Sequence, residues 1–213
     1  MNSNNMKRLR NIIIALSLVS QLAAQGVDTA FIYQITQHRE EYKTHFLTDP
    51  RSPLRAKDTA YLDFYAPDPA WHIPARLTLT PEAAPFDMLT YSGVTRLYQQ
   101  YGILDFEADG KAQQMRIYQN LTLIAKDSSF RDYLFLPFKD LTNAQTTYGG
   151  GRYMDFKTGD IKENILILDF NKCYNPWCAY SDGFNCPVPP RENHLKMEVT
   201  AGEKGYLKKV KRE

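Results

Sequence analysis

The feature that most constrains the fold is a hairpin signature in the middle of the chain. Two runs in which apolar and polar residues alternate, Ile103–Ala108 and Lys111–Tyr118, are separated only by Asp109-Gly110. An Asp-Gly pair between alternating runs is the strongest short-range signal for a β-hairpin, since both residues tolerate the positive φ angles of a tight turn. The sequence therefore predicts two antiparallel strands joined at this pair.

Further short runs of aromatic and β-branched residues, each bounded by proline or glycine, extend the strand pattern along the chain. They are Ala60–Tyr65, Trp71–Leu79, Asp87–Ser92, Leu121–Ala125 and Tyr133–Phe138, and another strand is expected to start at Tyr153. The run Ile165–Leu168 is continuously apolar, which is typical of a strand covered on both faces. The 14 tyrosines and 11 phenylalanines also favour sheet.

One α-helix is predicted before the strands, over Ala30–Leu47. Phe31, Ile35, Tyr42 and Phe46 lie near one stripe at helical spacing, and the prolines at positions 50 and 53 end the helix. The predicted fold is mainly β, a single barrel or sandwich domain with one N-terminal α-helix. Alternation alone does not distinguish a closed barrel from two packed sheets.

The first 24 residues have the three-part layout of a secretory signal peptide. Lys7, Arg8 and Arg10 precede a 13-residue apolar stretch from Ile12 to Ala24. That stretch is shorter than the roughly 20 residues of a membrane-spanning helix, so a retained anchor is the weaker interpretation. We expect cleavage at or next to Ala24, one β-rich domain over residues 25–213, no membrane span in the mature chain, and a periplasmic or secreted location.

The charge balance gives no support for nucleic-acid binding. The formal net charge is +2, and without the three basic residues of the leader 23 basic side chains stand against 24 acidic ones. A nucleic-acid partner requires a basic surface that this near-neutral composition does not supply. The partners that the sequence leaves open are a small molecule or another envelope protein.

Residues that could form a site are concentrated between positions 138 and 203. This segment mixes polar side chains with tyrosines and contains all three cysteines, and loops of this kind often carry function on a rigid scaffold. The predicted ligand-binding residues are Arg152, Tyr153, Asp169, Asn171, Asn175, Tyr180, Glu192 and Asn193.

The run Gly149-Gly150-Gly151-Arg152 has two interpretations. Consecutive glycines allow close backbone approach, so their N–H groups can form a nest for an anion beside the arginine. The other interpretation is a tight turn before the strand that starts at Tyr153, with Arg152 paired to an internal carboxylate. Neither a phosphate-binding loop nor a dinucleotide fingerprint is present. The turn and the internal pair are favoured.

The cysteine spacing favours one disulfide. Cys178 and Cys186 are eight residues apart around a turn-rich segment, and an odd count in an oxidising compartment indicates one pair and one leftover thiol. Cys173 is then a small buried hydrophobe. A zinc site built from Cys178, Cys186 and His194 is the alternative, but no CxxC or HxxxH spacing supports it. We predict no metal site, and no motif indicates a cofactor.

The C-terminal half of the chain resembles a bacterial family, the domain-of-unknown-function family 1684. The motifs that carry the resemblance are Thr147-Tyr148-Gly149-Gly150-Gly151-Arg152-Tyr153, Asp169-Phe170-Asn171, Tyr174-Asn175-Pro176, Cys178-Ala179-Tyr180, Cys186-Pro187 with Pro189-Pro190, Glu192-Asn193 and Ala201-Gly202-Glu203-Lys204. Ser52-Pro53-Leu54 and the strand-rich middle are also similar, so the resemblance covers nearly all of the expected mature chain.

The resemblance implies no activity, because the family has none established. The family pattern includes Cys178 and Cys186 but usually has another residue at position 173, which agrees with pairing the first two. Similar proteins without obvious export signals share the pair, however, and a structural disulfide is unexpected in a reducing cytosol. The resemblance therefore keeps metal binding or thiol chemistry open without placing either above the disulfide.

Two functional hypotheses follow from the sequence. In the first, the chain is a non-catalytic envelope or ligand-binding module that uses a polar loop face around Arg152. In the second, it is an enzyme of unrecognised type, with Asp169 or Glu192 as general acid or base and Arg152 as an anion clamp. A third interpretation gives these residues no ligand at all, because buried polar side chains commonly satisfy one another and brace loops.

Overall fold

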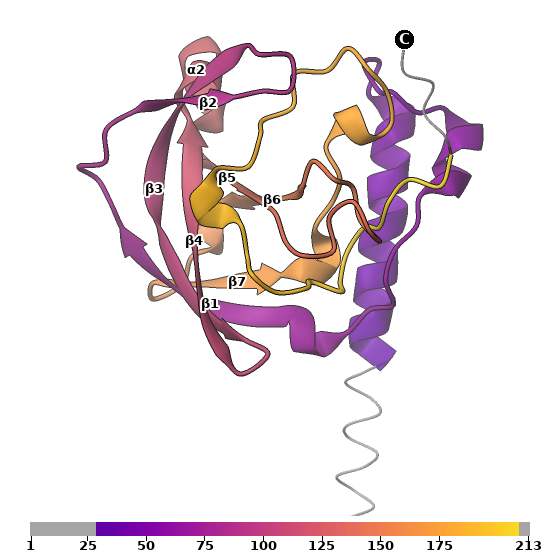
Figure 1. Cartoon of the computed structure of the whole chain (residues 1–213), viewed down its shortest axis with the longest axis horizontal. Coiled ribbons are helices and arrows are strands. Elements are labelled where there is room, and N and C mark those ends of the chain that lie inside the picture. Colours follow the sequence, from indigo (N-terminus) through magenta and orange to yellow (C-terminus); the bar gives the residue numbers. More distant parts are fainter. Residues whose placement is uncertain (1–28, 209–213) are drawn as a thin grey trace, which may run out of the picture.

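The structure is a computed structural model that describes residues 29–208. The predicted signal peptide lies outside the described residues. Residues 29–208 fold around one curled antiparallel sheet (Figure 1). The strands are β1 His72–Leu79, β2 Phe86–Leu89, β3 Thr95–Ala108, β4 Lys111–Asn120, β5 Tyr133–Phe138, β6 Arg152–Lys157 and β7 Ile165–Asp169. Their order is β6-β5-β4-β3-β1-β7, with β2 paired to β3 beside this path. The predicted mainly β fold is confirmed, in the form of a half-barrel.

The Asp109-Gly110 hairpin is confirmed and supplies the longest strand pair of the sheet. Asp109 and Gly110 have φ angles of 52° and 65°, and the register runs from Ala108 opposite Lys111 to Tyr98 opposite Asn120. Positive φ at both turn residues matches the right-handed twist of the flanking strands, as two-residue hairpin turns require.

A helix over residues 29–48 stands opposite the sheet, at the right of Figure 1. The predicted apolar stripe of this helix is confirmed at Ile35 and Phe46, which are both buried against the rest of the protein. Tyr42 lies between them on the same face and packs its ring edge-on against Phe46 at 5.0 Å between centroids. The helix is therefore held by one aromatic and aliphatic stripe.

Two predicted strands are wrong because side chains cap helical turns there. Leu121–Lys126 forms the short helix α2, since the Asn120 side chain accepts a hydrogen bond from the Leu123 amide at 2.9 Å. The segment predicted as a strand from Ala60 begins inside a 3-10 helix, Ala56–Tyr61, in which Asp58 accepts from the Arg55 amide at 3.0 Å.

Six further 3-10 turns connect the strands and loops in the described part of the chain. They are Pro69–Trp71, Ser128–Asp132, Thr158–Asp160, Phe170–Lys172, Trp177–Ala179 and Arg191–Asn193. Among residues 29–208 no helix is both long enough and apolar enough to cross a membrane.

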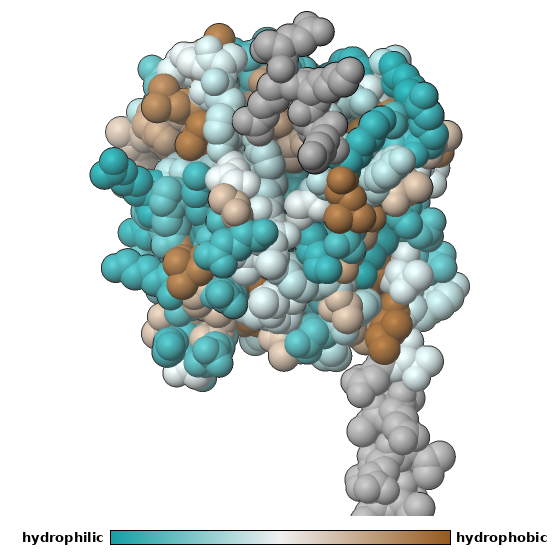
Figure 2. Space-filling view, turned by 45° about the vertical axis from the view of Figure 1, so that its right-hand side comes forward, coloured by the Kyte–Doolittle hydropathy of each residue, from teal (hydrophilic) through white to brown (hydrophobic). Residues whose placement is uncertain are grey.

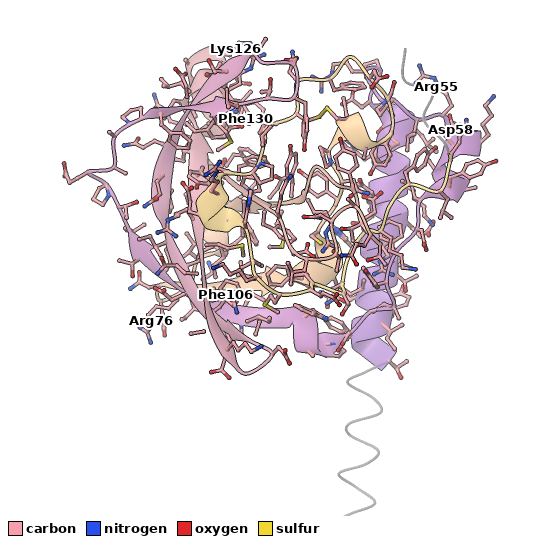
Figure 3. All side chains as sticks on the ribbon, in the orientation of Figure 1. Arg55, Asp58, Arg76, Phe106, Lys126 and Phe130 are labelled. Carbon is pink, nitrogen blue, oxygen red and sulfur yellow. A yellow bond between two sulfur atoms is a disulfide. The ribbon has the colours of Figure 1, made fainter. Side chains whose placement is uncertain are left out.

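The main core fills the concave side of the sheet. Phe106 on β3 points inward and is buried, whereas Arg76 on β1 lies on the convex outside (Figure 3). The C-terminal segment closes this core, because Leu195, Met197 and Val199 alternate with exposed residues and pack against the sheet. On the face shown in Figure 2, apolar side chains form small separate groups within a largely polar surface.

Candidate functional site

The two ends of the curled sheet, β6 and β7, face each other across a cavity of about 690 Å³. Its walls include Asp155 of β6 and Ile167 of β7, and the helix over 29–48 contributes Tyr42. Ile167 corrects the expectation that β7 is covered on both faces, since 38% of its surface is exposed and it borders this cavity. We call this cavity the β6–β7 cleft. Its volume is within the range of small-molecule sites.

Two tyrosine hydroxyls hold the Asp155 carboxylate at the β6–β7 cleft. One of its oxygens accepts from the Tyr133 hydroxyl at 2.7 Å and the other from the Tyr174 hydroxyl at 2.6 Å. The residue is exposed to solvent where it borders the cleft. Burial raises the pKa of Asp155 and outweighs the two hydrogen bonds, which lower it. The pair of hydroxyl donors fixes the orientation of the carboxylate.

The opposite side of the cleft carries mixed charge. Asp169 lies 3.4 Å from the Lys172 ammonium, and His38 of the helix borders the same space. Burial, followed by the nearby Lys172 charge, lowers the pKa of His38, which favours the neutral imidazole. Asp160 also borders the cleft, and neither Asp155 nor Asp160 forms an ion pair with any described residue.

Aromatic rings form much of the remaining wall. Tyr42, Phe156, Tyr174 and Trp177 border the β6–β7 cleft, and the Tyr42 and Tyr174 rings contact each other at 5.9 Å between centroids. Aromatic faces bind apolar groups and attract cations through the negative charge of their π systems. The cleft therefore combines flat apolar surfaces with carboxylates.

A buried carboxylate ties the wall of the cleft to the helix. Glu203 accepts from the Tyr42 hydroxyl at 3.0 Å, from the Tyr180 hydroxyl at 2.7 Å and from the Asn175 amide at 2.8 Å. Burial raises the pKa of Glu203 to about 7. Asn175 also donates its side-chain amide to the Lys204 carbonyl at 2.7 Å. This network positions Tyr42 at the cleft.

The sequence matches the family described as "Protein of unknown function (DUF1684)" over residues 57–204. The chain belongs to the DUF1684 family. The predicted membership is thus confirmed, and its restriction to bacteria stays a prediction. Among solved structures, the chain is similar to the solution NMR structure of an uncharacterized protein of Haloarcula marismortui, with 31% identity and a TM-score of 0.63. The match covers 83% of this chain and 95% of that one. No curated protein matches.

In this DUF1684 chain the predicted site residue Arg152 lies in the interior. Its side chain has no exposed surface and pairs with Asp140 at 2.8 Å. The guanidinium also donates to the carbonyls of Val199, at 2.8 Å, and Ala201, at 2.5 Å. The internal ion pair expected for Arg152 is therefore present, and its terminal nitrogens have protein partners.

All three predicted asparagines have protein partners as well. Asn171 exchanges hydrogen bonds with the backbone of Asp68, at 2.8 and 2.9 Å. Asn193 does the same with the backbone of Arg116, at 2.7 and 2.8 Å. With Asn175, these side chains connect loops to strands, which is the bracing role of buried polar groups.

Of the eight predicted ligand-binding residues, Asp169 is the one that borders the β6–β7 cleft. Tyr180 and Asn175 reach its wall through Glu203. Tyr153 donates from its hydroxyl to the Pro187 carbonyl, and the exposed Glu192 accepts from Tyr118 at 3.4 Å, away from the cleft. The ligand-binding role of the eight stays a prediction.

The predicted site residues leave out Asp155 of β6, Tyr42 of the helix and Tyr174 of the loop after Phe170–Lys172, all of which border the cleft. Position 155 stands out locally as a charged residue between aromatic and apolar neighbours of β6. No local sequence pattern, however, predicts that β6 is one end of the sheet and that it faces β7 at the other end. That relation depends on long-range strand pairing.

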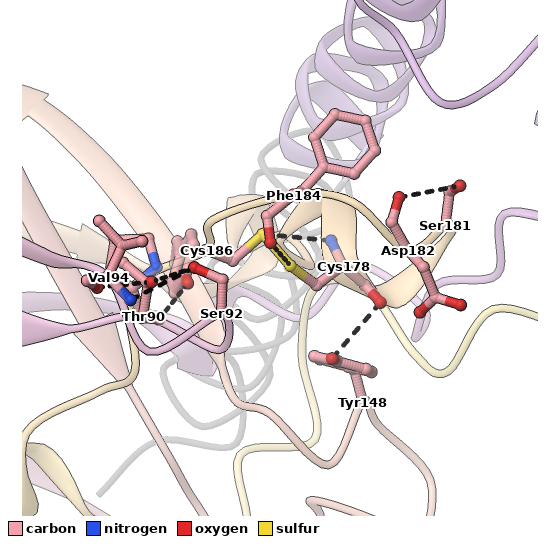
Figure 4. Close-up of a disulfide and its surroundings, with 11 residues drawn as sticks. Thr90, Ser92, Val94, Tyr148, Cys178, Ser181, Asp182, Phe184 and Cys186 are labelled. Carbon is pink, nitrogen blue, oxygen red and sulfur yellow. Dashed lines mark hydrogen bonds between the residues drawn. A yellow bond between two sulfur atoms is a disulfide. The ribbon is translucent and has the colours of Figure 1, made fainter. Parts of the chain in front are cut away.

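The disulfide Cys178–Cys186 is present, with 6.3 Å between the Cα atoms (Figure 4). Cys173 is free and buried. The bond leaves no thiolate on these two residues for the zinc alternative. Among residues 29–208, no three His, Cys, Asp or Glu side chains lie close enough together to hold a metal ion. The disulfide loop also borders a second cavity, of about 750 Å³, beside the glycines at positions 149 and 150.

Proposed function

We propose that this DUF1684 protein is an exported binding module that holds a small organic cation in the β6–β7 cleft. The observation that carries the proposal is the pair of carboxylates, Asp155 and Asp160, which border an aromatic-walled cavity without a basic partner among the described residues. An unpaired carboxylate in a partly enclosed space attracts a cation more strongly than one in water, because the effective dielectric constant is lower.

Export is supported by the leader and by the disulfide. The signal-peptide layout of residues 1–24 predicts transport, and a structural disulfide is stable in an oxidising compartment. The test is the intact mass of the protein recovered from the periplasm or medium of a producing cell. A chain that begins at or next to residue 25 supports export, and a full-length chain found only in the cytosol contradicts it.

The ligand class follows from the arrangement of rings and charge. Tyr133 and Tyr174 occupy one lone-pair direction on each Asp155 oxygen, so the carboxylate is oriented before a ligand arrives and loses little freedom on binding. Tyr42, Tyr174 and Trp177 supply faces on which a cation can stack. Lys172 is paired with Asp169 and therefore does not offset the charge of Asp155.

The enzymatic alternative would have to use the same cleft. Asp169 borders it, whereas Glu192 lies elsewhere, so of the two acid or base residues expected from the sequence only Asp169 lies at the cleft. No observed geometry favours a reaction over binding, and we propose binding.

The binding test uses benzyltrimethylammonium as an aromatic cation, with benzyl alcohol as its neutral counterpart and titration calorimetry as the readout. We expect the cation to bind more tightly than the alcohol. Asp155→Asn should weaken cation binding about tenfold, because the loss of one contact with a charged group typically reduces the affinity by at least this factor. Asp105→Asn, on the convex face of β3 and exposed, is the matched control and should bind as the natural protein does. Equal affinity for both probes, or an unaffected Asp155→Asn variant, would contradict the proposal.

A further inference from the structure

The triglycine turn borders the second cavity with unused backbone donors. Gly151 donates its amide to the Tyr148 carbonyl at 3.2 Å, which closes a turn with Gly149 and Gly150 at its centre. Both central residues border the cavity of about 750 Å³. Neither central amide donates a hydrogen bond to any residue of 29–208. Adjacent backbone N–H groups of this kind bind anions.

A lysine without an ion pair stands beside these amides. Lys139 follows β5 and borders the same cavity, and a side chain added at Gly151 would come within 3.1 Å of its Cγ atom. The Lys139 ammonium pairs with no carboxylate among the described residues. The backbone of Lys139 is fixed by Asn193 and Leu195, through hydrogen bonds of 3.0 and 2.8 Å, so the base of this side chain is held in place.

A tyrosine hydroxyl completes the donor group. A Cβ atom at Gly150 would lie 2.4 Å from the Tyr91 hydroxyl oxygen, so this hydroxyl rests directly on the turn where only glycine leaves room. Burial, with a smaller effect of Tyr148, raises the pKa of Tyr91 to about 12, so Tyr91 is a neutral donor. It gives no hydrogen bond to another described residue.

We propose that this second cavity binds an anionic oxygen group, a phosphate or a carboxylate, through the Gly149 and Gly150 amides, Lys139 and Tyr91. Three kinds of hydrogen-bond donor border this one cavity, and one of them is a lysine ammonium. The site is separate from the β6–β7 cleft and does not depend on the function proposed for it.

One acidic residue, Asp182, borders the same cavity as the glycine turn. It provides a second test of the proposal, in which anion binding should become stronger and not weaker. Asp182 lies in the disulfide loop and is exposed. Figure 4 shows it on the same loop as Cys178 and Ser181. Its negative charge weakens binding of an anion, so its removal should strengthen binding.

The experiment is a two-dimensional amide NMR titration of the mature protein with sodium phosphate, sodium sulfate and sodium acetate at constant ionic strength. We expect saturable shifts of the Gly149 and Gly150 amide signals. Lys139→Met keeps the aliphatic stem and should weaken binding about tenfold or more. Lys196→Met, an exposed lysine elsewhere, is the control and should titrate as the natural protein does. Asp182→Asn should tighten binding about twofold.

The three salts identify the group that is bound. Saturation by phosphate and sulfate alone assigns a tetrahedral anion, and saturation by acetate alone assigns a carboxylate. Saturation by all three salts shows that the site accepts either group. The proposal is overturned if none of the salts gives saturable shifts at these amides. It is also overturned if Lys139→Met and Lys196→Met have the same affinity, or if Asp182→Asn binds more weakly. A folded Lys139→Met variant is recognised by unchanged signals from the core residues of β3 and β4.

Discussion

The Arg152 guanidinium and the Asp140 carboxylate form an ion pair of 2.8 Å in which neither side chain is exposed to solvent. Asp140 also accepts from the Thr142 amide at 2.8 Å, and Arg152 donates to the Val199 carbonyl at 2.8 Å. The pair therefore joins the start of β6, the loop after β5 and the C-terminal segment at one point beneath the surface.

Arg152→Met should lower the free energy of unfolding by about 3–5 kcal/mol, because it leaves the Asp140 charge buried and unpaired. Lys157→Met removes an exposed pair with Asp132, at 3.4 Å, and should cost at most about 1 kcal/mol. Urea unfolding at pH 7 measures both. If the two variants were equally stable, the buried pair would not be the brace that the geometry describes.

Glu203 should make stability depend on pH in a direction unusual for a carboxyl group. Its pKa is raised by burial to about 7 from an ordinary value of 4.5, so the folded state keeps the proton to higher pH than the unfolded state. The stabilisation by the neutral form is complete below about pH 4.5 and is lost as pH rises toward 7. The total loss is on the order of 3 kcal/mol.

The comparison that isolates this effect is the natural protein against Glu203→Gln, whose side chain does not titrate. Unfolding free energies of both, measured from pH 4.5 to 7.5, should show the natural protein losing stability relative to the variant across this range. A difference that stays constant with pH would mean that Glu203 is already ionised in the folded state at low pH.

Gly202 should not tolerate a side chain. Its φ is +73°, and an added Cβ would lie 2.3 Å from the Cys173 sulfur and 2.6 Å from the Phe170 carbonyl oxygen. Gly202→Ala is therefore expected to destabilise the protein by roughly 2 kcal/mol or more, from backbone strain and overpacking together. Gly159→Ala, where no atom lies within 4 Å, is the control and should change the melting temperature little.

Removing the disulfide should cost about 2–3 kcal/mol, the chain-entropy value for a loop of this length. The double variant Cys178→Ser with Cys186→Ser, compared with the natural protein in urea, measures this cost. Thiol alkylation of the denatured, non-reduced natural protein should add one label, at Cys173, and alkylation after reduction should add three. Three labels before reduction would show that the bond does not form in the exported protein.

Local sequence features predicted those parts of the fold that local contacts stabilise. Asp109-Gly110 predicted its hairpin because the turn depends on two residues and their neighbours. Tyr133–Phe138 was predicted with the bounds that β5 has. The stripe of Ile35 and Phe46 identified the buried face of the helix. The same approach failed at Leu121, where the Asn120 cap outweighed a strand-like composition.

The partner of Arg152 shows where prediction from the sequence reached its limit. A planar cation followed by many candidate carboxylates indicates an internal pair, and that pair is present. Its identity depends on the path of the chain between β5 and β6, which brings Asp140 back over the start of β6. Residue spacing does not contain that path, since a loop of 13 residues can close in many ways.

The sequence by itself determined the mainly β class, the central hairpin, the apolar face of the N-terminal helix, the cysteine pair and the family. Each of these rests on residue types within short stretches, where backbone conformation and side-chain burial follow from spacing. Only the tertiary structure decided the location of the sites. The β6–β7 cleft exists because His72 pairs with Asp169, and Asp155 faces it because β6 ends the sheet. Such distant pairings are set by the packing of the whole core, because no local interaction is strong enough to select among the alternative strand orders.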